Sequence, residues 1–401
     1  MLQLTEAADG FLARVRLPGG LLSGDQLAAL ARLADSLGDG RVTLTSRGNV
    51  QLRGLAADAA DTLTGGLTEA GLLPSLTHDR VRNFLASPLA GLDREPDLTG
   101  IVRALDAALC ARPRLAELPG RFLFAIDDGR GDVAGLGADV VATVRPGGAV
   151  VNGLAVRAAP DADLSDMDDL TGMSGHGVPG GLRDVIVTVM LSCAEAFLDL
   201  RAELGSTAWR IADLPDGPGR VRAAVAARLG LGTPRQEPGV PAAARPVGLI
   251  TWWQAGEGDE PPPYVRDNRA SSAVLIAALG RLTSAQLTWV AEQIPGRHAR
   301  ITPWRSIVLP GLSDATGVLR AAAGLGFGVD DASPWLRVTA CAGRPGCASA
   351  LADVQADAGA FAARWPGRLV HVSGCARHCG RPAATEIDVT ATSEGYHVAG
   401  V

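Results

Sequence analysis

The sequence contains no lysine. All 37 of its basic residues, histidine aside, are arginines. This excludes mechanisms that need a lysine amine, such as Schiff-base catalysis or phosphate binding by the lysine of a P-loop. Any anion that the protein binds must be held by arginine side chains, backbone N–H groups or helix N-termini.

Other features are also missing. No apolar run approaches the 18 residues of a membrane-spanning helix, and the N-terminus lacks the basic and apolar regions of a secretory signal. We therefore predict a cytoplasmic protein without a membrane partner. The net charge of −6 argues against general nucleic-acid binding. No G-x-G-x-x-G motif follows a strand and opens a helix, so we do not expect a dinucleotide-binding domain within this sequence.

Six cysteines fall into two groups. Cys110 and Cys193 lie in apolar, helix-like sequence and are predicted to be buried small hydrophobic residues. The other four are close to the C-terminus: Cys341, Cys347, Cys375 and Cys379. In a reducing compartment such a group indicates a metal or cofactor site rather than disulfides.

The spacing of these four cysteines favours an iron–sulfur cluster over zinc. Five residues separate the first pair and three separate the second, whereas paired zinc ligands usually stand two to four residues apart on tight turns. Glycines flank both pairs and let the backbone present N–H groups to sulfur. We predict a [4Fe–4S] cluster ligated by all four thiolates.

Two segments of the chain repeat each other. Residues 12–55 are predicted to form a strand, a helix with a Ser23/Gln26 capping box, and two more strands. Residues 274–312 repeat this order with a Thr283/Gln286 capping box. The repeat predicts internal duplication with a pseudo-two-fold axis. Arg47, Gln51 and Arg53 of the first copy become Trp304, Val308 and Pro310, so we expect only the first copy to line a polar site.

Between the copies, the pattern predicts a long helix over 182–204 and a glycine-rich loop over 172–181. The acidic segment 127–132 resembles a calcium loop only loosely and is interpreted as a hairpin turn. Residues 214–246 are rich in proline, glycine, alanine and arginine, which is typical of a linker.

Several motifs together resemble the nitrite/sulfite reductase superfamily over most of the chain. They are Arg14-Val-Arg-Leu-Pro-Gly-Gly20, Thr45-Ser-Arg47 with Gln51, Arg82-Asn83, Thr302-Pro-Trp-Arg305, and Ser-Gly-Cys375-Ala-Arg-His-Cys379-Gly-Arg-Pro. The resemblance implies an α+β fold with two ferredoxin-like half-domains and two α/β domains related by a pseudo-two-fold. We predict half-domains at 1–70 and 247–325, α/β domains at 75–210 and 330–401, and a linker at 211–246.

Within that superfamily the sequence is similar to the precorrin-3B synthases, on the evidence of Ala125-Ile-Asp-Asp-Gly129 and Trp209-Arg210. Around Arg121, two basic residues of the sulfite reductases are replaced by Gly120 and Leu123. The resemblance implies a monooxygenase that hydroxylates precorrin-3A and forms a γ-lactone, with a [4Fe–4S] cluster, a non-haem iron and O₂. The electrons would come from a reduced donor such as NADH or through an external reductase or ferredoxin. The alternatives are a sirohaem-dependent nitrite or sulfite reductase and a non-catalytic electron carrier.

The precorrin substrate would carry many carboxylates, and several cations must converge on it. The substrate-binding candidates are Arg16, Arg47, Gln51, Arg53, Arg82, Asn83 and Arg121. On a strand, Gln51 and Arg53 would share a face. No paired spacing of histidines predicts iron ligands: His78, His176 and His378 are interpreted as structural or loop residues, and the catalytic residues stay unknown.

Overall fold

The structure is a computed structural model of the whole chain. It describes residues 2–92, 95–145, 147–157, 178, 180–232, 248–251 (backbone only) and 271–400. Most of the predicted glycine-rich loop at 172–181, with His176, lies outside these residues, as do residues 233–246 of the predicted linker. Among the described helices, none is long and apolar enough to cross a bilayer.

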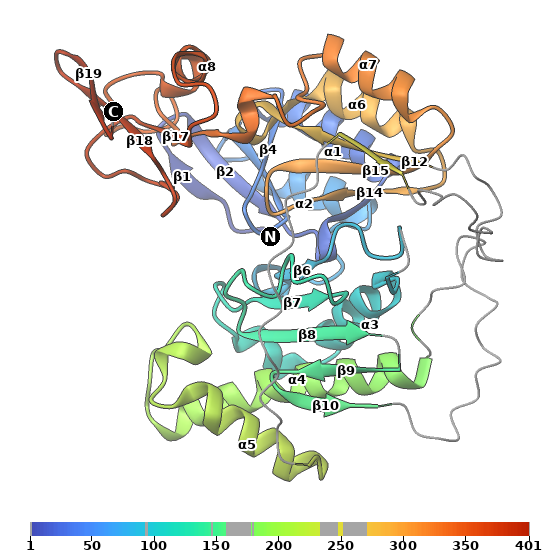
Figure 1. Cartoon of the computed structure of the whole chain (residues 1–401). Coiled ribbons are helices and arrows are strands. Elements are labelled where there is room, and N and C mark those ends of the chain that lie inside the picture. The colour runs from blue at the N-terminus through green and yellow to red at the C-terminus, as the bar shows by residue number, and fades with distance from the viewer. Residues whose placement is uncertain are drawn as a thin grey trace.

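Two five-stranded sheets lie at the centre of the molecule (Figure 1). The first has the order β1 (Thr5–Ala7), β2 (Gly10–Val15), β5 (Val50–Leu55), β4 (Arg41–Leu44), β13 (Arg281–Thr283). The second has the order β11 (Gly248–Thr251), β12 (Ser271–Ile276), β15 (Ser306–Leu312), β14 (His298–Ile301), β3 (Leu21–Ser23). All pairs in both sheets are antiparallel.

The two sheets exchange edge strands. Strand β3 belongs to the first copy in sequence but pairs with β14 of the second, with Leu22 opposite Ala299. Strand β13 does the reverse and pairs with β4, with Leu282 opposite Val42. Each sheet is therefore completed by a strand from the other copy, which makes the two copies one structural unit.

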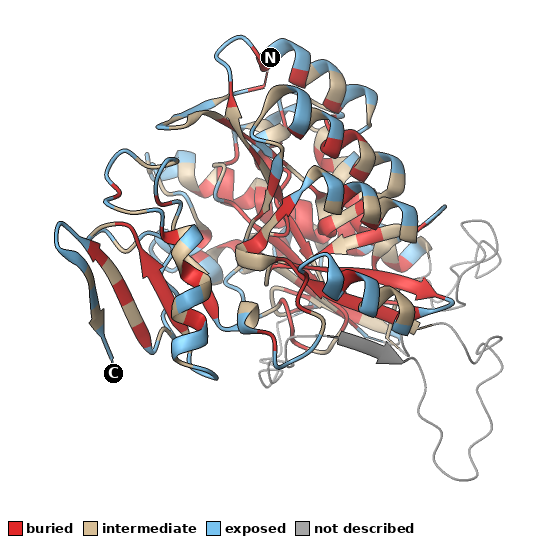
Figure 2. Cartoon of the chain, turned by 90° about the horizontal axis from the view of Figure 1, so that it is seen from above, coloured by how far each residue is buried: buried red, intermediate tan, exposed pale blue. Residues whose placement is uncertain are grey.

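Helices cover one face of the two sheets. They are α1 (Gly24–Leu37), α2 (Ala60–Glu69), α6 (Ser284–Gln293) and α7 (Ala315–Gly324). Both predicted capping boxes are confirmed, since Ser23 and Thr283 each accept from the backbone N–H of the glutamine three residues on. Leu30, Leu52, Leu275 and Leu309 belong to one shared core between the sheets and these helices. Figure 2 shows the buried residues concentrated in the strands and on the helix faces that contact them.

The duplication is confirmed in backbone detail. A single 3-10 turn precedes the exchanged strand in both copies: η1 (Pro18–Gly20) before β3 and η6 (Ala278–Gly280) before β13. The middle residue of each turn has a left-handed backbone, with φ of 62° at Gly19 and 53° at Leu279. A leucine rarely adopts this conformation, so the second copy retains the turn at a conformational cost.

A third sheet has the order β10 (Leu154–Val156), β9 (Gly148–Val151), β8 (Val140–Arg145), β7 (Phe124–Asp127), β6 (Phe84–Ala86). Strands β6, β7 and β8 are parallel, and β9 and β10 turn back as hairpins. Helix α4 (Gly180–Glu203) packs on it, and α3 (Thr99–Cys110) and the short turn η3 (Pro113–Glu117) pack on α4. The short turn η2 (Asp79–Val81) adds Val81 to the same core. The predicted helix at 182–204 is confirmed as α4, and Cys193 is buried in it as predicted.

In this region one prediction is wrong, and another segment carries more secondary structure than its composition indicates. The described part of the predicted linker forms η5 (Ile211–Asp213) and α5 (Gly217–Leu229), which packs on α4 because Val221 and Val225 make a buried stripe one turn apart. Residues 127–132 cannot form a hairpin turn, because β7 and β8 on either side are parallel.

The fourth sheet has the order β16 (Val338–Ala340), β17 (Val370–Ser373), β18 (Ile387–Thr392), β19 (Gly395–Ala399). The first three strands are parallel and β19 pairs antiparallel. This arrangement repeats that of β6 to β9. Helix α8 (Val354–Arg364) covers one face of this sheet, and η7 (Pro334–Leu336) precedes it in the chain. The predicted α+β class is confirmed, whereas the predicted domain limits stay predictions.

Candidate functional site

The four C-terminal cysteines lie on two adjacent loops. The loop with Cys341 and Cys347 follows β16, and the loop with Cys375 and Cys379 follows β17. Because β16 and β17 are parallel neighbours, both loops leave the same edge of the fourth sheet. The sequence spacing alone could not place them together, since 27 residues and helix α8 intervene.

Gly374 joins these two cysteine loops. Its backbone N–H donates to Cys341 Sγ at 3.1 Å, and its carbonyl accepts from the N–H of Leu351 at 2.8 Å. A Cβ at residue 374 would lie 2.7 Å from Ala350 Cβ. Only glycine permits this approach, as the sequence predicted for the residues that flank the cysteines.

In the described part of the chain, no three of the cysteine sulfurs lie within 4.8 Å of one another, so the thiols are not gathered around a single ion. All six cysteines are free thiols. Around one zinc ion, with Zn–S bonds of about 2.3 Å, thiolate sulfurs lie about 3.8 Å apart. Among the described residues, the one set of three candidate ligand atoms within 4.8 Å of one another contains no cysteine. Four thiolates that share two glycine-rich loops but are more widely spaced have the donor chemistry of an iron–sulfur cluster.

Arg53 contacts the first cysteine loop. Its guanidinium binds Asp9 through Nε and Nη2, at 3.0 and 2.8 Å, and Nη2 also donates to the carbonyl of Gly346 at 3.0 Å. Asp9 lies in the turn between β1 and β2, and Gly346 directly precedes Cys347. The outer face of the first sheet therefore touches the cysteine loop.

A group of arginines lies on and beside the same face. Burial, opposed by the charge of Asp79 and reinforced by Arg14, Arg47 and Arg82, lowers the pKa of Arg16 to about 10. Burial also lowers the pKa of Arg47, together with the charges of Arg210 and Arg121. The buried Nε of Arg16 has no hydrogen-bond partner. Cations that are crowded and partly desolvated in this way favour an anionic ligand.

Three of these arginines are held in place by a neighbour. Arg121 lies over the indole of Trp209, 5.1 Å from the ring centroid, and Arg210 pairs with Asp139 at 2.7 Å. Arg47 donates to the carbonyl of Gly120 at 3.2 Å. The candidate list missed Arg14, Trp209 and Arg210. The available signal was the pairing of an aromatic residue with a cation at 209–210, a combination that can stack on a flat ligand.

Gln51 lies between the arginines and the cysteine loop. On β5 it is opposite Arg14 of β2, and Arg53 follows two residues later on the same face. Successive side chains on one face of a strand are about 6.6 Å apart. Gln51 and Arg53 therefore share a face, as predicted, and β5 connects the arginine group to the cysteines.

Arg82 and Asn83 are placed differently from the other candidates. Arg82 is 2% exposed and binds both carboxylate oxygens of Asp106 at 2.7 Å, and also the carbonyl of Leu72. Asn83 is fully buried, and its amide donates to the carbonyls of Arg80, Gly120 and Phe122. Asn83 therefore holds the segment that carries Gly120, whereas Arg82 holds its own segment on α3 and Leu72, and both side chains are bonded within the protein.

The second copy has lost the polar face. Val274 and Val308 on β12 and β15 are fully buried against Leu92, whereas their counterparts in the first sheet are polar. Arg300 of β14 donates to the carbonyls of Pro88 and Ala90, which holds the segment before Leu92 against the second sheet. The expectation that only the first copy lines a polar site is in accord with this packing.

An acidic loop follows β7. Asp127, Asp128 and Asp132 are all buried, and their carboxylate oxygens approach within 4.8 Å. Asp127 accepts four backbone N–H groups, and Asp128 pairs with Arg130 at 2.8 Å. Burial, and then the charges of Asp128 and Asp127, raise the pKa of Asp132 to about 6 although Ser87 donates to it. These contacts account for the loop as a structural element.

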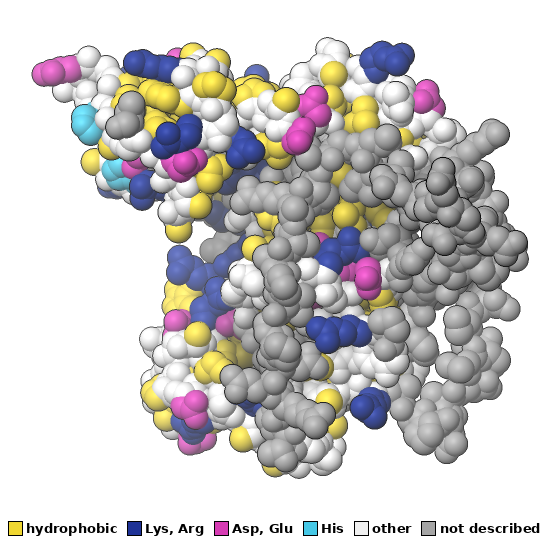
Figure 3. Space-filling model, in the orientation of Figure 1, with side chains coloured by type: hydrophobic (Ala, Val, Ile, Leu, Met, Phe, Trp, Pro, Cys, Tyr) yellow, Lys and Arg dark blue, Asp and Glu magenta, His cyan; other side chains and the backbone are white. Residues whose placement is uncertain are grey.

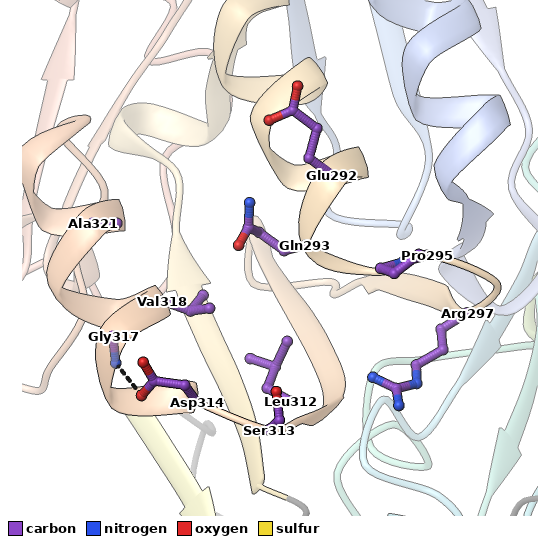
Figure 4. Close-up of a pocket in the computed structure, with 10 residues that line it drawn as sticks. All are labelled: Glu292, Gln293, Pro295, Arg297, Leu312, Ser313, Asp314, Gly317, Val318 and Ala321. Atoms are coloured by element: carbon purple, nitrogen blue, oxygen red, sulfur yellow. Dashed lines mark hydrogen bonds between the residues drawn. The ribbon is translucent and has the colours of Figure 1, made fainter.

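Two hollows of the molecule are candidate places for a ligand. A pocket of about 650 Å³ lies between α6 and α7 (Figure 4). It contains none of the predicted site residues, and Glu292, Arg297 and Asp314 give it mixed charge. Figure 3 shows a different hollow at the left of the molecule, between the C-terminal sheet above and the third sheet below, with basic side chains at its edge. The second location suits a polycarboxylate better.

Comparisons with known proteins agree on one family. Residues 5–70 match the model of the nitrite/sulfite reductase ferredoxin-like half domain. The chain is 28% identical to the precorrin-3B synthase of Sinorhizobium sp., over 98% of this chain and 79% of that protein. It is 37% identical to the ferredoxin–nitrite reductase of Synechococcus elongatus, over only 30% of this chain and 25% of that protein. The NirA protein of Mycobacterium tuberculosis has the same fold, with a TM-score of 0.70 and 18% identity over 97% of this chain and 73% of that one.

Proposed function

We propose that this chain, which belongs to the nitrite/sulfite reductase superfamily, is a precorrin-3B synthase of aerobic cobalamin biosynthesis. The reaction hydroxylates precorrin-3A and closes a γ-lactone from a ring acetate. One oxygen atom of O₂ enters the product, and the other leaves as water with two electrons from an external donor. The similarity to a precorrin-3B synthase along nearly the whole chain supports this assignment over nitrite reduction, where the similarity to the cyanobacterial enzyme covers less than a third.

The observation that carries the proposal is the continuity of β5. Gln51 stands opposite Arg14 in the arginine-bearing part of the first sheet, and Arg53, two residues on, bonds to the loop of Cys347. A flat polycarboxylate bound on this face would lie beside the cysteine loops. This is the juxtaposition that a redox reaction on a tetrapyrrole needs, because electron transfer and bond formation both require close approach.

The chain's own residues would bind and orient the substrate. Arg16 and Arg47 are half-buried cations that can pair with ring carboxylates, and Arg121 with Trp209 can cover a macrocycle edge. Gln51 supplies a neutral donor between them. We assign Asn83 to holding the Gly120 segment that Arg47 also contacts, and Arg82 to holding its own segment against α3 through Asp106.

Cys341, Cys347, Cys375 and Cys379 would hold the [4Fe–4S] cluster, which supplies single electrons when bound. The chain contributes the N–H of Gly374 toward Cys341, a donor that stabilises thiolate charge. We assign no ligands to the predicted non-haem iron. The one compact set of possible ligands among the described residues is the acidic loop after β7, and its carboxylates are already bonded to backbone N–H groups, Arg130 and Ser87.

The test is an anaerobic purification followed by an absorption spectrum, then addition of precorrin-3A, O₂ and a reductant. The proposal expects broad cluster absorption without sirohaem bands, and a product one oxygen atom heavier that forms only with O₂. Cys375→Ser should lose iron and the broad absorption. Sirohaem bands in the isolated protein, with no conversion of precorrin-3A, would instead assign nitrite or sulfite reduction. A cluster with no tetrapyrrole binding would indicate an electron carrier.

A further inference from the structure

We propose that Asp9 and Arg53 form a clamp that holds the loop of Cys341 and Cys347 on the first sheet, so that Arg53 positions Cys347 and does not bind substrate. This inference rests on the proposed function for the role of the cysteines, and on the contacts alone for the clamp. It changes the role predicted for Arg53 from its place in the strand pattern.

The hydrogen bonds of Arg53 carry the first step. Nε and Nη2 bind the two carboxylate oxygens of Asp9, and the second N–H of Nη2 donates to the carbonyl of Gly346. Three of the five guanidinium N–H groups are therefore occupied within the protein. Both side chains are only 17% exposed, which shields the pair from solvent and strengthens its electrostatic attraction.

The fit of Gly346 carries the second step. A Cβ at this residue would lie 2.9 Å from Arg53 Nη2 and 3.2 Å from Asp9 Oδ2. The loop backbone thus lies directly against the ion pair, with no side chain between them. Cys347 is the next residue, so its backbone is fixed through one peptide unit.

A second connection from the same sheet holds the other end of the loop. The carbonyl of Cys341 accepts from Gln355 Nε2 at 3.2 Å, and Gln355 on α8 in turn accepts from Arg281 of β13. Strands β5 and β13 flank β4 in the first sheet. Hydrogen bonds therefore connect the backbone near both cysteines to the first sheet, on the same face that carries Gln51 and Arg14.

The clamp makes a prediction that direct substrate binding does not. If Arg53 only holds the loop, Asp9→Asn and Arg53→Gln should have the same effect, and the double variant should add nothing. If Arg53 binds a substrate carboxylate, Arg53→Gln should weaken tetrapyrrole binding whereas Asp9→Asn should not.

The experiment compares amide hydrogen exchange in residues 341–351 of the full chain, purified and stripped of iron, between the wild type and these variants. Reporter amides are those of Arg344, Ala350 and Leu351, whose N–H groups are bonded within or next to the loop. We expect about tenfold faster exchange in Asp9→Asn, Arg53→Gln and the double variant, as for loss of one charge-assisted hydrogen bond. Arg32→Gln, an exposed arginine on α1, is the control and should exchange at the wild-type rate.

The same variants are then loaded with iron and sulfide, and iron per chain is measured over time in air. The clamp expects several-fold faster loss in Asp9→Asn and Arg53→Gln than in Arg32→Gln. Unchanged exchange at 341–351 in Asp9→Asn would overturn the clamp even if the cluster binds. A wild type that takes up no cluster would overturn the proposed function. The amide exchange of the iron-free proteins would still show whether Asp9 and Arg53 hold the loop.

Discussion

The backbone N–H of Gly374 points at Cys341 Sγ across a distance of 3.1 Å. The contact joins loops that follow two neighbouring parallel strands, and it depends on the missing side chain of residue 374. Four thiolates concentrate negative charge in a small volume, so each N–H donor directed at them lowers the free energy of the ligated state.

Gly374→Ala should weaken the cysteine site without unfolding the protein. The added Cβ would meet Ala350 Cβ at 2.7 Å, which forces the two loops apart at a cost of about 1–3 kcal/mol. We expect several-fold less iron per chain after reconstitution, measured by iron and sulfide analysis. Gly65→Ala on α2, where a Cβ meets nothing within 4 Å, is the matched control and should retain full iron content.

Arg82→Met should destabilise the fold, because it leaves the carboxylate of Asp106 without its partner. Arg82 has a side-chain exposure of 3%, and the pair has two hydrogen bonds of 2.7 Å. Removal of one member of a buried ion pair costs about 3 kcal/mol or more. Urea unfolding should show this loss, and Arg82→Met combined with Asp106→Leu should recover part of it. Equal stability of wild type and Arg82→Met would show that the pair does not support the fold.

Arg47→Gln should weaken the binding of a polycarboxylate porphyrin about 10- to 100-fold. The expected loss corresponds to one charge-assisted hydrogen bond in a partly desolvated site. Isothermal titration at two salt concentrations should also show a smaller salt dependence in the variant, because one cation fewer meets the ligand. An unaltered affinity would exclude Arg47 from the binding face, and Arg32→Gln provides the control for total charge.

Asp132→Asn should change the pH dependence of stability. The pKa of Asp132 is raised to about 6 in the folded protein, so the folded state binds the proton more tightly than the unfolded state. The linked stabilisation is complete below the unfolded pKa of about 4 and is lost as the pH rises through 6, by at most about 3 kcal/mol.

Relative to wild type, Asp132→Asn should therefore gain stability between pH 4.5 and 7.5, as measured by urea unfolding at several pH values. An asparagine oxygen can still accept from Ser87, which keeps the local hydrogen bond. A stability difference between the two proteins that does not vary with pH would contradict the raised pKa.

Local patterns predicted the duplicated unit well. The capping boxes at Ser23 and Thr283 and the alternation in β5 are set by residues near one another in sequence. The partners of edge strands are set by distant residues, so the exchange of β3 and β13 left no local signal. The helix α5 was missed because its composition is that of a linker and only Val221 and Val225 mark its buried side.

The candidate site shows the same division. The pattern correctly placed Gln51 and Arg53 on one face of β5. It also grouped the four cysteines as ligands of one cofactor, but their two loops are brought together by the parallel pairing of β16 and β17, which the spacing does not show. The strand pattern shows which face Arg53 lies on but not which residues it binds. Its partners are distant in sequence: Asp9 lies 44 residues before Arg53, and Gly346 lies 293 residues after it. Arg82 was likewise selected by motif, although the partly buried carboxylate of Asp106 on α3 binds it.

The exchanged strands also affect how the chain can be made. Strand β4 has no neighbour on one side until Arg281–Thr283 has been synthesised, long after the rest of the first sheet has left the ribosome. At about 5–20 residues per second, this open edge persists for roughly ten seconds or more on each nascent chain. During that interval the edge can pair with another nascent chain, and the exposed Arg41 on β4 is the kind of charge that discourages such pairing. Translation speed between the two copies therefore becomes a determinant of yield.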